Sequence, residues 1–135
     1  MEKDPETGNR KQETGNRKPG IQRGSDIAER LLSFAVAVMR LTKQLPKDTA
    51  GRHVASQILR SATSGGANYE EARAAESRDD FIHKIGVALK EVRESVFWLA
   101  LIQRSGWGDA SALIREAEEL CAILGASKRT AKSRD

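Results

Sequence analysis

The sequence of 135 residues predicts an all-α fold, an antiparallel up-and-down four-helix bundle, on three observations. Four successive stretches carry apolar residues at alternating spacings of three and four, which is the period of one helix face. The three prolines, Pro5, Pro19 and Pro46, all lie outside the interiors of these stretches, so none would break a helix. No stretch shows the period-two alternation of a strand, and the short connections favour antiparallel neighbours.

The first 24 residues contain no apolar stripe and predict a disordered arm. The hexapeptide ETGNRK occurs at 6–11 and again at 13–18. Its period of seven lacks the apolar positions that a coiled coil requires. We treat an arm that binds a partner and an arm without a function as equally open alternatives.

The first predicted helix starts after Ser25 or Asp26, either of which can accept hydrogen bonds as an N-cap. Pro46 ends it, since the residue before a proline disfavours helical geometry. Its apolar spacing is that of a heptad seam, which requires helical partners. The seam consists of Ile27, Leu31, Phe34, Val38, Leu41 and Leu45.

The second predicted helix begins at a cap formed by Asp48 or Thr49. Its stripe includes a glycine in phase with the apolar residues: Ala55, Ile58, Ala62, Gly65, Tyr69 and Ala72. We therefore interpret Gly65, Gly66 and Ala67 as a small-residue packing surface inside one helix rather than as a phosphate loop. A Walker loop would need a following Lys and Ser or Thr. On this interpretation Gly66 contacts a neighbouring helix, and Gly65→Ile is tolerated.

The third predicted helix is capped by Ser77, with Asp80 in a position like that of a capping box. Its main stripe is Phe81, Ile85, Ala88, Val92, Ser95, Leu99 and Ile102. A second apolar row, made of Ile82, Leu89 and Val96, widens this face. So wide a face exceeds what a simple pair of helices covers, and it predicts self-association.

The fourth predicted helix follows the break SGWGD at 105–109. Its stripe is Leu113, Ala117, Leu120 and Leu124, and Gly125 is a natural C-terminal residue. The bundle is thus expected to span 25–125, followed by a basic tail at 126–135.

The formal charge of +4, with a pI near 9.5, is concentrated in the two ends of the chain. Residues 1–24 hold six basic and four acidic residues, 126–135 hold four and one, and 25–125 hold 13 and 14. A positive excess suits contact with phosphates, although solvated helix faces would give the same pattern. The candidate contacts for RNA or DNA are Arg30, Arg40, Lys43, Lys47, Arg52, Arg60, Lys128, Arg129, Lys132 and Arg134.

No arrangement of residues predicts catalysis, a cofactor or a metal centre. The two histidines, His53 and His83, cannot supply the paired Glu-x-x-His motifs of a di-iron bundle. The single cysteine, Cys121, falls on a helix stripe, where an inert thiol is usual. No apolar stretch is long enough to span a membrane, and the N-terminus is too polar for a secretion signal. We expect a cytoplasmic protein that is not an enzyme and has no small-molecule substrate.

The segment QILRSATSGGANYEEARAAESRDDFIHKIGVALKEVRESVFWLALI, at 57–102, resembles the core of the bacterial 23S rRNA intervening-sequence proteins. The resemblance lies in Arg60-Ser61, Thr63-Ser64, Gly66-Ala67-Asn68, Glu71-Ala72 and Ser77, and in positions between Phe81 and Leu99. These last positions are Phe81 to Lys84, Ala88 to Glu91, Arg93, Glu94, Trp98 and Leu99. Gly65 departs from it, since the family places an apolar residue such as Ile there. The resemblance implies a small bundle that assembles as a ring-like homopentamer and has no established molecular function.

Two classes of function follow from these observations. The first is a non-enzymatic oligomeric bundle that binds RNA or DNA weakly and mainly by charge, through basic surfaces and chiefly through the two tails at 1–24 and 126–135. The alternative is a protein-interaction scaffold without a nucleic-acid role. A branch of similar fold, the accessory protein of diversity-generating retroelements that works with a reverse transcriptase, adds a further alternative that the resemblance alone implies.

Overall fold

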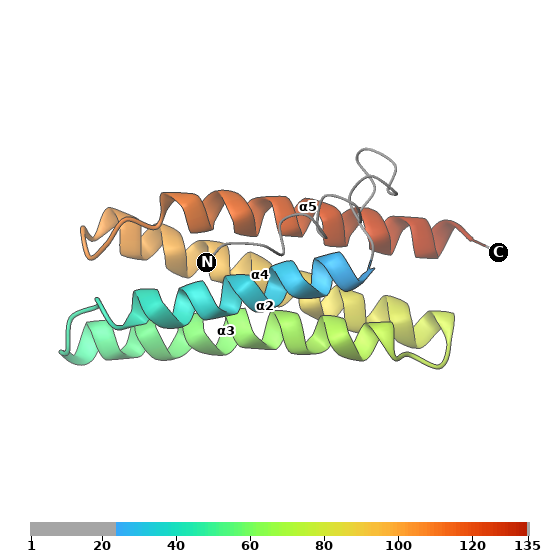
Figure 1. Ribbon diagram of the computed structural model, residues 1–135, viewed down its shortest axis with the longest axis horizontal. Coiled ribbons are helices and arrows are strands. Elements are labelled where there is room, and N and C mark those ends of the chain that lie inside the picture. The colour runs from blue at the N-terminus through green and yellow to red at the C-terminus, as the bar shows by residue number, and fades with distance from the viewer. Residues whose placement is uncertain (1–23, 135) are drawn as a thin grey trace, which may run out of the picture.

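The computed structural model describes residues 24–134, and within them it contains four α-helices and no strand. They are α2 (Gly24–Thr42), α3 (Thr49–Arg73), α4 (Arg78–Arg104) and α5 (Ser111–Ser133). Each helix runs antiparallel to the one before it (Figure 1). The predicted all-α class with four helices is confirmed. The predicted arm lies, except for Gly24, outside the described residues, and Gly24 itself is helical.

The helices pack as a four-membered bundle in which each contacts its sequence neighbours. Contacts join α2 to α3, α3 to α4 and α4 to α5, and α2 also meets α5. The α3–α4 interface is the most extensive, whereas α2 and α5 touch over a much smaller area. The bundle is therefore built around the α3–α4 pair.

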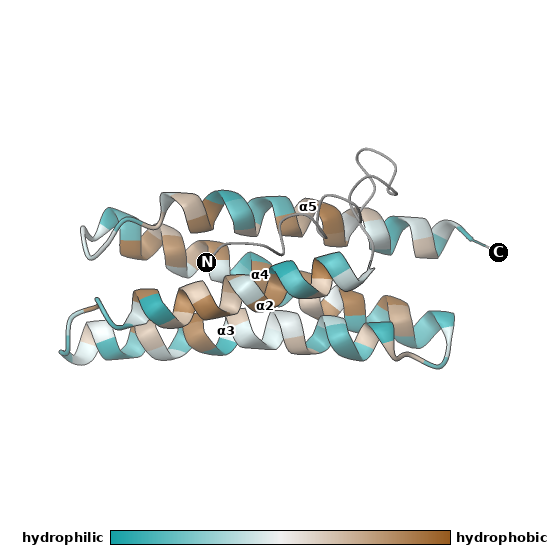
Figure 2. Cartoon of the chain, in the orientation of Figure 1, coloured by the Kyte–Doolittle hydropathy of each residue, from teal (hydrophilic) through white to brown (hydrophobic). Residues whose placement is uncertain are grey.

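The core consists almost entirely of the predicted stripes. Residues such as Leu31, Ile58, Val92 and Leu120 are completely buried. Apolar residues recur along each helix among hydrophilic ones (Figure 2). The second row of α4, by contrast, is half-buried rather than open. Its Leu89 and Val96 pack against the core, so the bundle itself covers much of the wide face from which self-association was predicted.

The predicted N-caps of α3 and α4 are confirmed, whereas that of α2 is not. Asp48 accepts a hydrogen bond from the Gly51 backbone N–H at 2.9 Å, and Ser77 accepts one from the Asp80 N–H at 3.0 Å. The cap expected at Ser25 or Asp26 is wrong, because both residues already lie within α2.

The last helix is longer than the sequence predicts. Gly125 does not end α5, which continues to Ser133. The segment 126–133 contains no proline, Ala131 is only 8% exposed, and Lys128 lies across α4 at Gly86. The early residues of α4 therefore give the extra turns a surface to pack on. The predicted basic tail is, up to Ser133, the end of a helix.

Both glycines of the second predicted helix lie within a continuous α3, as predicted. A Cβ atom added at Gly66 would lie 3.6 Å from the Leu31 Cβ atom, which is an ordinary contact. One added at Gly65 would lie 2.8 Å from the Val92 Cγ2 atom. Gly65 is thus the tighter position, and this crowding argues against the expectation that Gly65→Ile is tolerated. Ala67 is exposed and does not pack between helices.

Candidate nucleic-acid interface

Arg30, a predicted nucleic-acid contact, forms an ion-pair clamp between α2 and α5. Its Nε atom donates to Glu116 Oε2 at 3.0 Å and its Nη2 atom to Glu116 Oε1 at 2.8 Å. The Nη2 atom also lies 3.0 Å from Glu119 Oε1. The hydrogen bonds to Glu116 raise the pKa of Arg30 despite its partial burial. This charge is already neutralised by two carboxylates, so it offers little to a phosphate.

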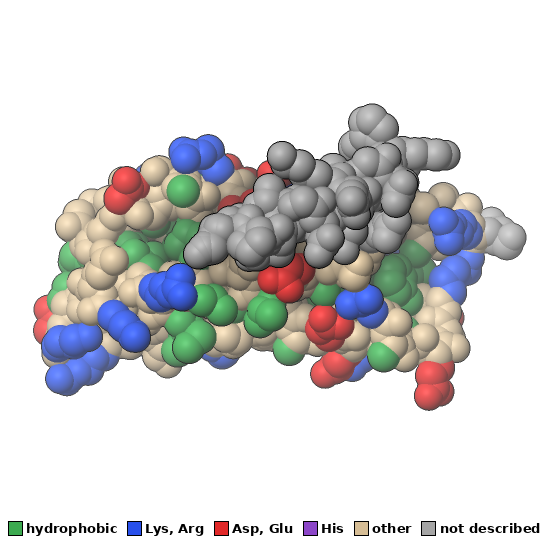
Figure 3. All heavy atoms as spheres, in the orientation of Figure 1, with side chains coloured by type: hydrophobic (Ala, Val, Ile, Leu, Met, Phe, Trp, Pro, Cys, Tyr) green, Lys and Arg blue, Asp and Glu red, His purple; other side chains and the backbone are tan. Residues whose placement is uncertain are grey.

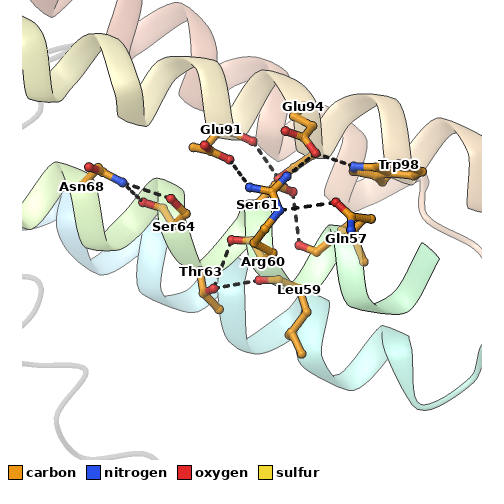
Figure 4. A network of polar contacts seen from close by, with 12 residues as sticks. Gln57, Leu59, Arg60, Ser61, Thr63, Ser64, Asn68, Glu91, Glu94 and Trp98 are labelled. Atoms are coloured by element: carbon orange, nitrogen blue, oxygen red, sulfur yellow. Dashed lines mark hydrogen bonds and ion pairs between the residues drawn. The ribbon is translucent and has the colours of Figure 1, made fainter. Parts of the chain in front are cut away.

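Arg60 is engaged in the same way between α3 and α4 (Figure 4). Its Nη1 atom lies 3.0 Å from Glu91 Oε1, and its Nη2 atom pairs with Glu94. Trp98 donates its indole N–H to Glu94 Oε2 at 2.9 Å. The Trp98 hydrogen bond and then the Arg60 pair lower the pKa of Glu94. Arg60 therefore belongs to the α3–α4 interface rather than to a free cationic surface.

A buried pair of hydroxyls lies at the same interface. The Oγ atoms of Ser61 and Ser95 are 2.8 Å apart, and both residues are fully buried. The Ser61 Oγ atom also lies 3.3 Å from the Ile58 carbonyl oxygen, and the Ser95 Oγ atom lies 3.1 Å from the Glu91 carbonyl oxygen. Because each hydroxyl has one proton, one serine donates to the other, which donates to its own backbone carbonyl. A satisfied buried pair of this kind costs little, whereas one partner left alone costs about 1–3 kcal/mol. Much of the motif behind the family resemblance thus holds α3 against α4.

Four other predicted contacts form what we call the cationic end: Arg40, Lys43, Lys47 and Arg52. They come from the last turn of α2, the connection to α3 and the first turn of α3, and all four are exposed. Lysine and arginine side chains gather at this end, at the lower left of Figure 3. Within residues 24–134 none of the four forms an ion pair. Asp48 lies between Lys47 and Arg52 in the sequence, and its side chain caps α3 by accepting a hydrogen bond from the Gly51 N–H.

Sequence reasoning missed two residues that lie together on α4. Phe97 is 60% exposed and shares a groove of about 410 Å³ with Arg104, in the last turn of α4. Phe97 also contacts Trp98 edge-on, with ring centroids 4.9 Å apart. The signal was available, because position 97 lies on neither apolar row of the helix. An exposed aromatic ring in a groove that an arginine also lines offers a stacking surface for a base.

The remaining predicted contacts lie at the opposite end of the bundle from the cationic end (Figure 1). Lys128 is half-buried, and Arg129, Lys132 and Arg134 are exposed. Of the ten predicted residues, Arg30 and Arg60 are therefore paired with carboxylates. The other eight form two groups of four, one at each end of the bundle.

The described residues offer little to metal or thiol chemistry. No group of three or more His, Cys, Asp or Glu side chains in this part of the chain could hold a metal ion. Cys121 is half-buried, and burial raises the pKa of its thiol against the opposing effect of Arg93. A raised pKa reduces the reactive thiolate fraction. None of the helices described is long and apolar enough to cross a membrane.

A third surface is apolar and lies on α2. Leu32, Val36 and Met39 are exposed there, at 59%, 37% and 49% of their surface. With residues of α3 that include Gly66, they line a groove of about 330 Å³. Apolar side chains along α2 are visible on the face shown in Figure 3. Such a patch on a small protein marks a contact surface.

Comparison with known proteins places the chain in a family. No curated protein matches it. A crystal structure of a protein with unknown function from the S23 ribosomal protein family of Bacteroides thetaiotaomicron is 35% identical, with a TM-score of 0.70. The match covers 76% of this chain and 97% of that one. A sequence model of the 23S rRNA-intervening sequence proteins matches residues 23–126. This agrees with the motifs at 57–102, and the chain belongs to the 23S rRNA-intervening sequence protein family.

Proposed function

We propose that this protein is a non-enzymatic bundle that binds RNA or DNA by charge, chiefly through the cationic end. The observation that carries the proposal is the contrast among the predicted cations. Arg30 and Arg60 are neutralised by carboxylates, whereas Arg40, Lys43, Lys47 and Arg52 are exposed without such partners in the described chain. Unpaired cations release counterions from a phosphate backbone when they bind it.

Binding of this kind has two properties that can be measured. It is insensitive to base sequence, because contacts to phosphates carry no base information. It also weakens with salt, with a log–log slope of about −0.9 per contact on duplex DNA and about −0.7 on single strands. Phe97, in the groove that Arg104 also lines, would add a preference for unpaired bases.

The test compares two variants that each lose two positive charges. Lys43→Gln/Lys47→Gln removes half of the cationic end. The control, Arg73→Gln/Lys84→Gln, removes two cations that are paired with Glu70 and Glu71; exposed pairs of this kind contribute only about 0–1 kcal/mol. We would measure polarisation of labelled RNA and DNA at two salt concentrations. The first variant should bind more weakly with a shallower salt slope. Equal weakening in both would show that only net charge matters, and the proposal would fail.

We also propose that the chain acts as a homo-oligomer, for which the family resemblance favours a pentamer. The observation that supports self-association is the exposed apolar row of Leu32, Val36 and Met39 on α2. A ring would present several cationic ends at once and so raise the avidity for a polymer. The same row would serve a protein-interaction scaffold without nucleic acid, which is the second candidate function.

Two further proposals concern the partner and the compartment. A role beside the reverse transcriptase of a diversity-generating retroelement is an alternative that the family resemblance alone carries. A cytoplasmic location is proposed because the sequence holds one cysteine, Cys121, and so lacks the internal disulfides that small secreted domains commonly use.

A further inference from the structure

A second cationic site lies between α4 and α5, in a pocket of about 290 Å³. Its polar lining consists of one imidazole and three amines, from His83, Lys90, Lys128 and Lys132. Its apolar floor is formed by Ile82, Gly86 and Val87. The volume is close to the lower limit for small-ligand pockets, roughly 300 Å³.

The pocket exists because of two features of the fold. The extension of α5 beyond Gly125 carries Lys128 and Lys132 alongside α4. Gly86 then leaves room for Lys128, since a Cβ atom added there would lie 3.1 Å from the Lys128 Nζ atom and 3.5 Å from its Cε atom. The half-buried Lys128 chain thus lies along the bare backbone of α4, with its ammonium group in the pocket.

The cations of this pocket have no carboxylate among their immediate neighbours in the pocket lining. In the described part of the chain none of the pocket's four polar residues forms an ion pair. Two acids of α3 and α4 are engaged elsewhere: Glu71 pairs with Lys84, and Glu91 with Arg60. Asp79 lies one turn before His83 on the same face of α4 and is exposed, outside the pocket lining. Three ammonium groups over an apolar floor repel one another, so an anion between them would stabilise the arrangement.

We propose that the pocket binds a phosphate group. Lysine ammonium groups bind phosphate as point charges, and three of them match a group that carries up to two negative charges. The phosphate can belong to a nucleic-acid backbone or to a free phosphate or nucleotide. The first source rests on the proposed nucleic-acid function, and the second does not.

The test uses two pocket variants and one control with matched charge. Gly86→Ala keeps every charge but places a methyl group where Lys128 lies, and the flexible lysine can move aside without disturbing the fold. Lys128→Gln/Lys132→Gln removes two ammonium groups. The control is Arg73→Gln/Lys84→Gln, which removes two cations that are already paired with Glu70 and Glu71. Binding of inorganic phosphate is followed by phosphorus NMR, and binding of labelled single-stranded RNA by polarisation.

The wild type and the control should bind inorganic phosphate equally. We expect the lysine double variant to bind it at least about tenfold more weakly and Gly86→Ala to bind it measurably more weakly. If RNA binding also falls in the two pocket variants, the phosphate belongs to a nucleic-acid backbone. If RNA binding is unchanged in them, the ligand is a free phosphate or nucleotide. If the wild type binds phosphate but no RNA, the proposed nucleic-acid function is wrong, and the proposal of a phosphate pocket stands. Absence of phosphate binding by the wild type, or binding unaltered in both pocket variants, would overturn the proposal.

Discussion

At the scale of single residues, Gly65 and Gly66 are adjacent but have different roles. The Gly65 backbone faces the Val92 side chain on α4, at a distance that leaves no room for a Cβ atom. Gly66 faces Leu31 on α2 with ordinary spacing and borders the apolar groove. The family resemblance places Ile at position 65, so the size of the residue at position 92 decides what position 65 can accept.

We therefore predict opposite effects for substitutions at the two glycines. Gly65→Ile should lower the free energy of unfolding, because overpacking costs about 1–3 kcal/mol and exceeds the gain in helix propensity of about 0.5 kcal/mol. Gly66→Ala should raise it by up to about 1 kcal/mol. Thermal unfolding at one protein concentration would rank the variants. A more stable Gly65→Ile would contradict the packing of α3 on α4.

A double-mutant cycle supplies the control for the Gly65 prediction. Val92→Ala alone opens a cavity in the fully buried core and should destabilise the protein. Combined with Gly65→Ile, it should make room for the new side chain. The pair should be more stable than the sum of the two single changes by roughly 0.5–3 kcal/mol, as for residues in contact.

Only part of the candidate nucleic-acid interface could be predicted from the sequence. The exposure of Arg40, Lys43, Lys47 and Arg52 followed from their positions off the apolar stripes. The pairing of Arg30 could not follow, because Glu116 is 86 residues away in the chain. Arg60 meets Glu91 across 31 residues. Charge counts identify cations but not their partners, which depend on how the helices rotate against one another.

At the scale of helices, the apolar stripes predicted every core face, because burial of one face per helix fixes the pattern. The end of α5 was missed since Gly125 has the residue type of a C-cap and no apolar stripe follows it. What continues the helix is the small Ala131, which is buried, together with the lysine stem on Gly86. Neither the burial of Ala131 nor the position of the lysine stem can be predicted from an apolar period, because both depend on contacts with α4.

The extension of α5 can be tested with two matched substitutions. Ala131→Asp places a carboxylate at a buried position, whereas Thr130→Asp places it at an exposed neighbour. Backbone amides at 126–131 should be protected from hydrogen exchange in the wild type and in Thr130→Asp. They should lose protection in Ala131→Asp, since helix ends without packing fray. Rapid exchange of these amides in the wild type would restore the interpretation of 126–135 as a tail.

At the scale of the whole molecule, the bundle presents an apolar row on α2 and cations at both ends. A row that includes Leu32 at 59% and Met39 at 49% exposure is unusual for a small monomer. We predict that light scattering coupled to gel filtration gives several times the chain mass of 14.8 kDa. Leu32→Lys/Met39→Lys should lower this mass. Ala112→Lys/Ala126→Lys, at exposed positions of α5, should leave it unchanged.

The same two variants separate avidity from charge in nucleic-acid binding. Each adds two positive charges per chain, so binding governed by charge alone would strengthen in both. If assembly brings several cationic ends onto one strand, the loss of assembly outweighs the added charge, because linked sites can raise affinity by about 10²–10⁴-fold. Leu32→Lys/Met39→Lys should then bind RNA more weakly than the wild type, whereas Ala112→Lys/Ala126→Lys should bind it more tightly. Equal strengthening in both variants would show that each chain binds independently, and a monomeric wild type at micromolar concentration would remove the basis for avidity.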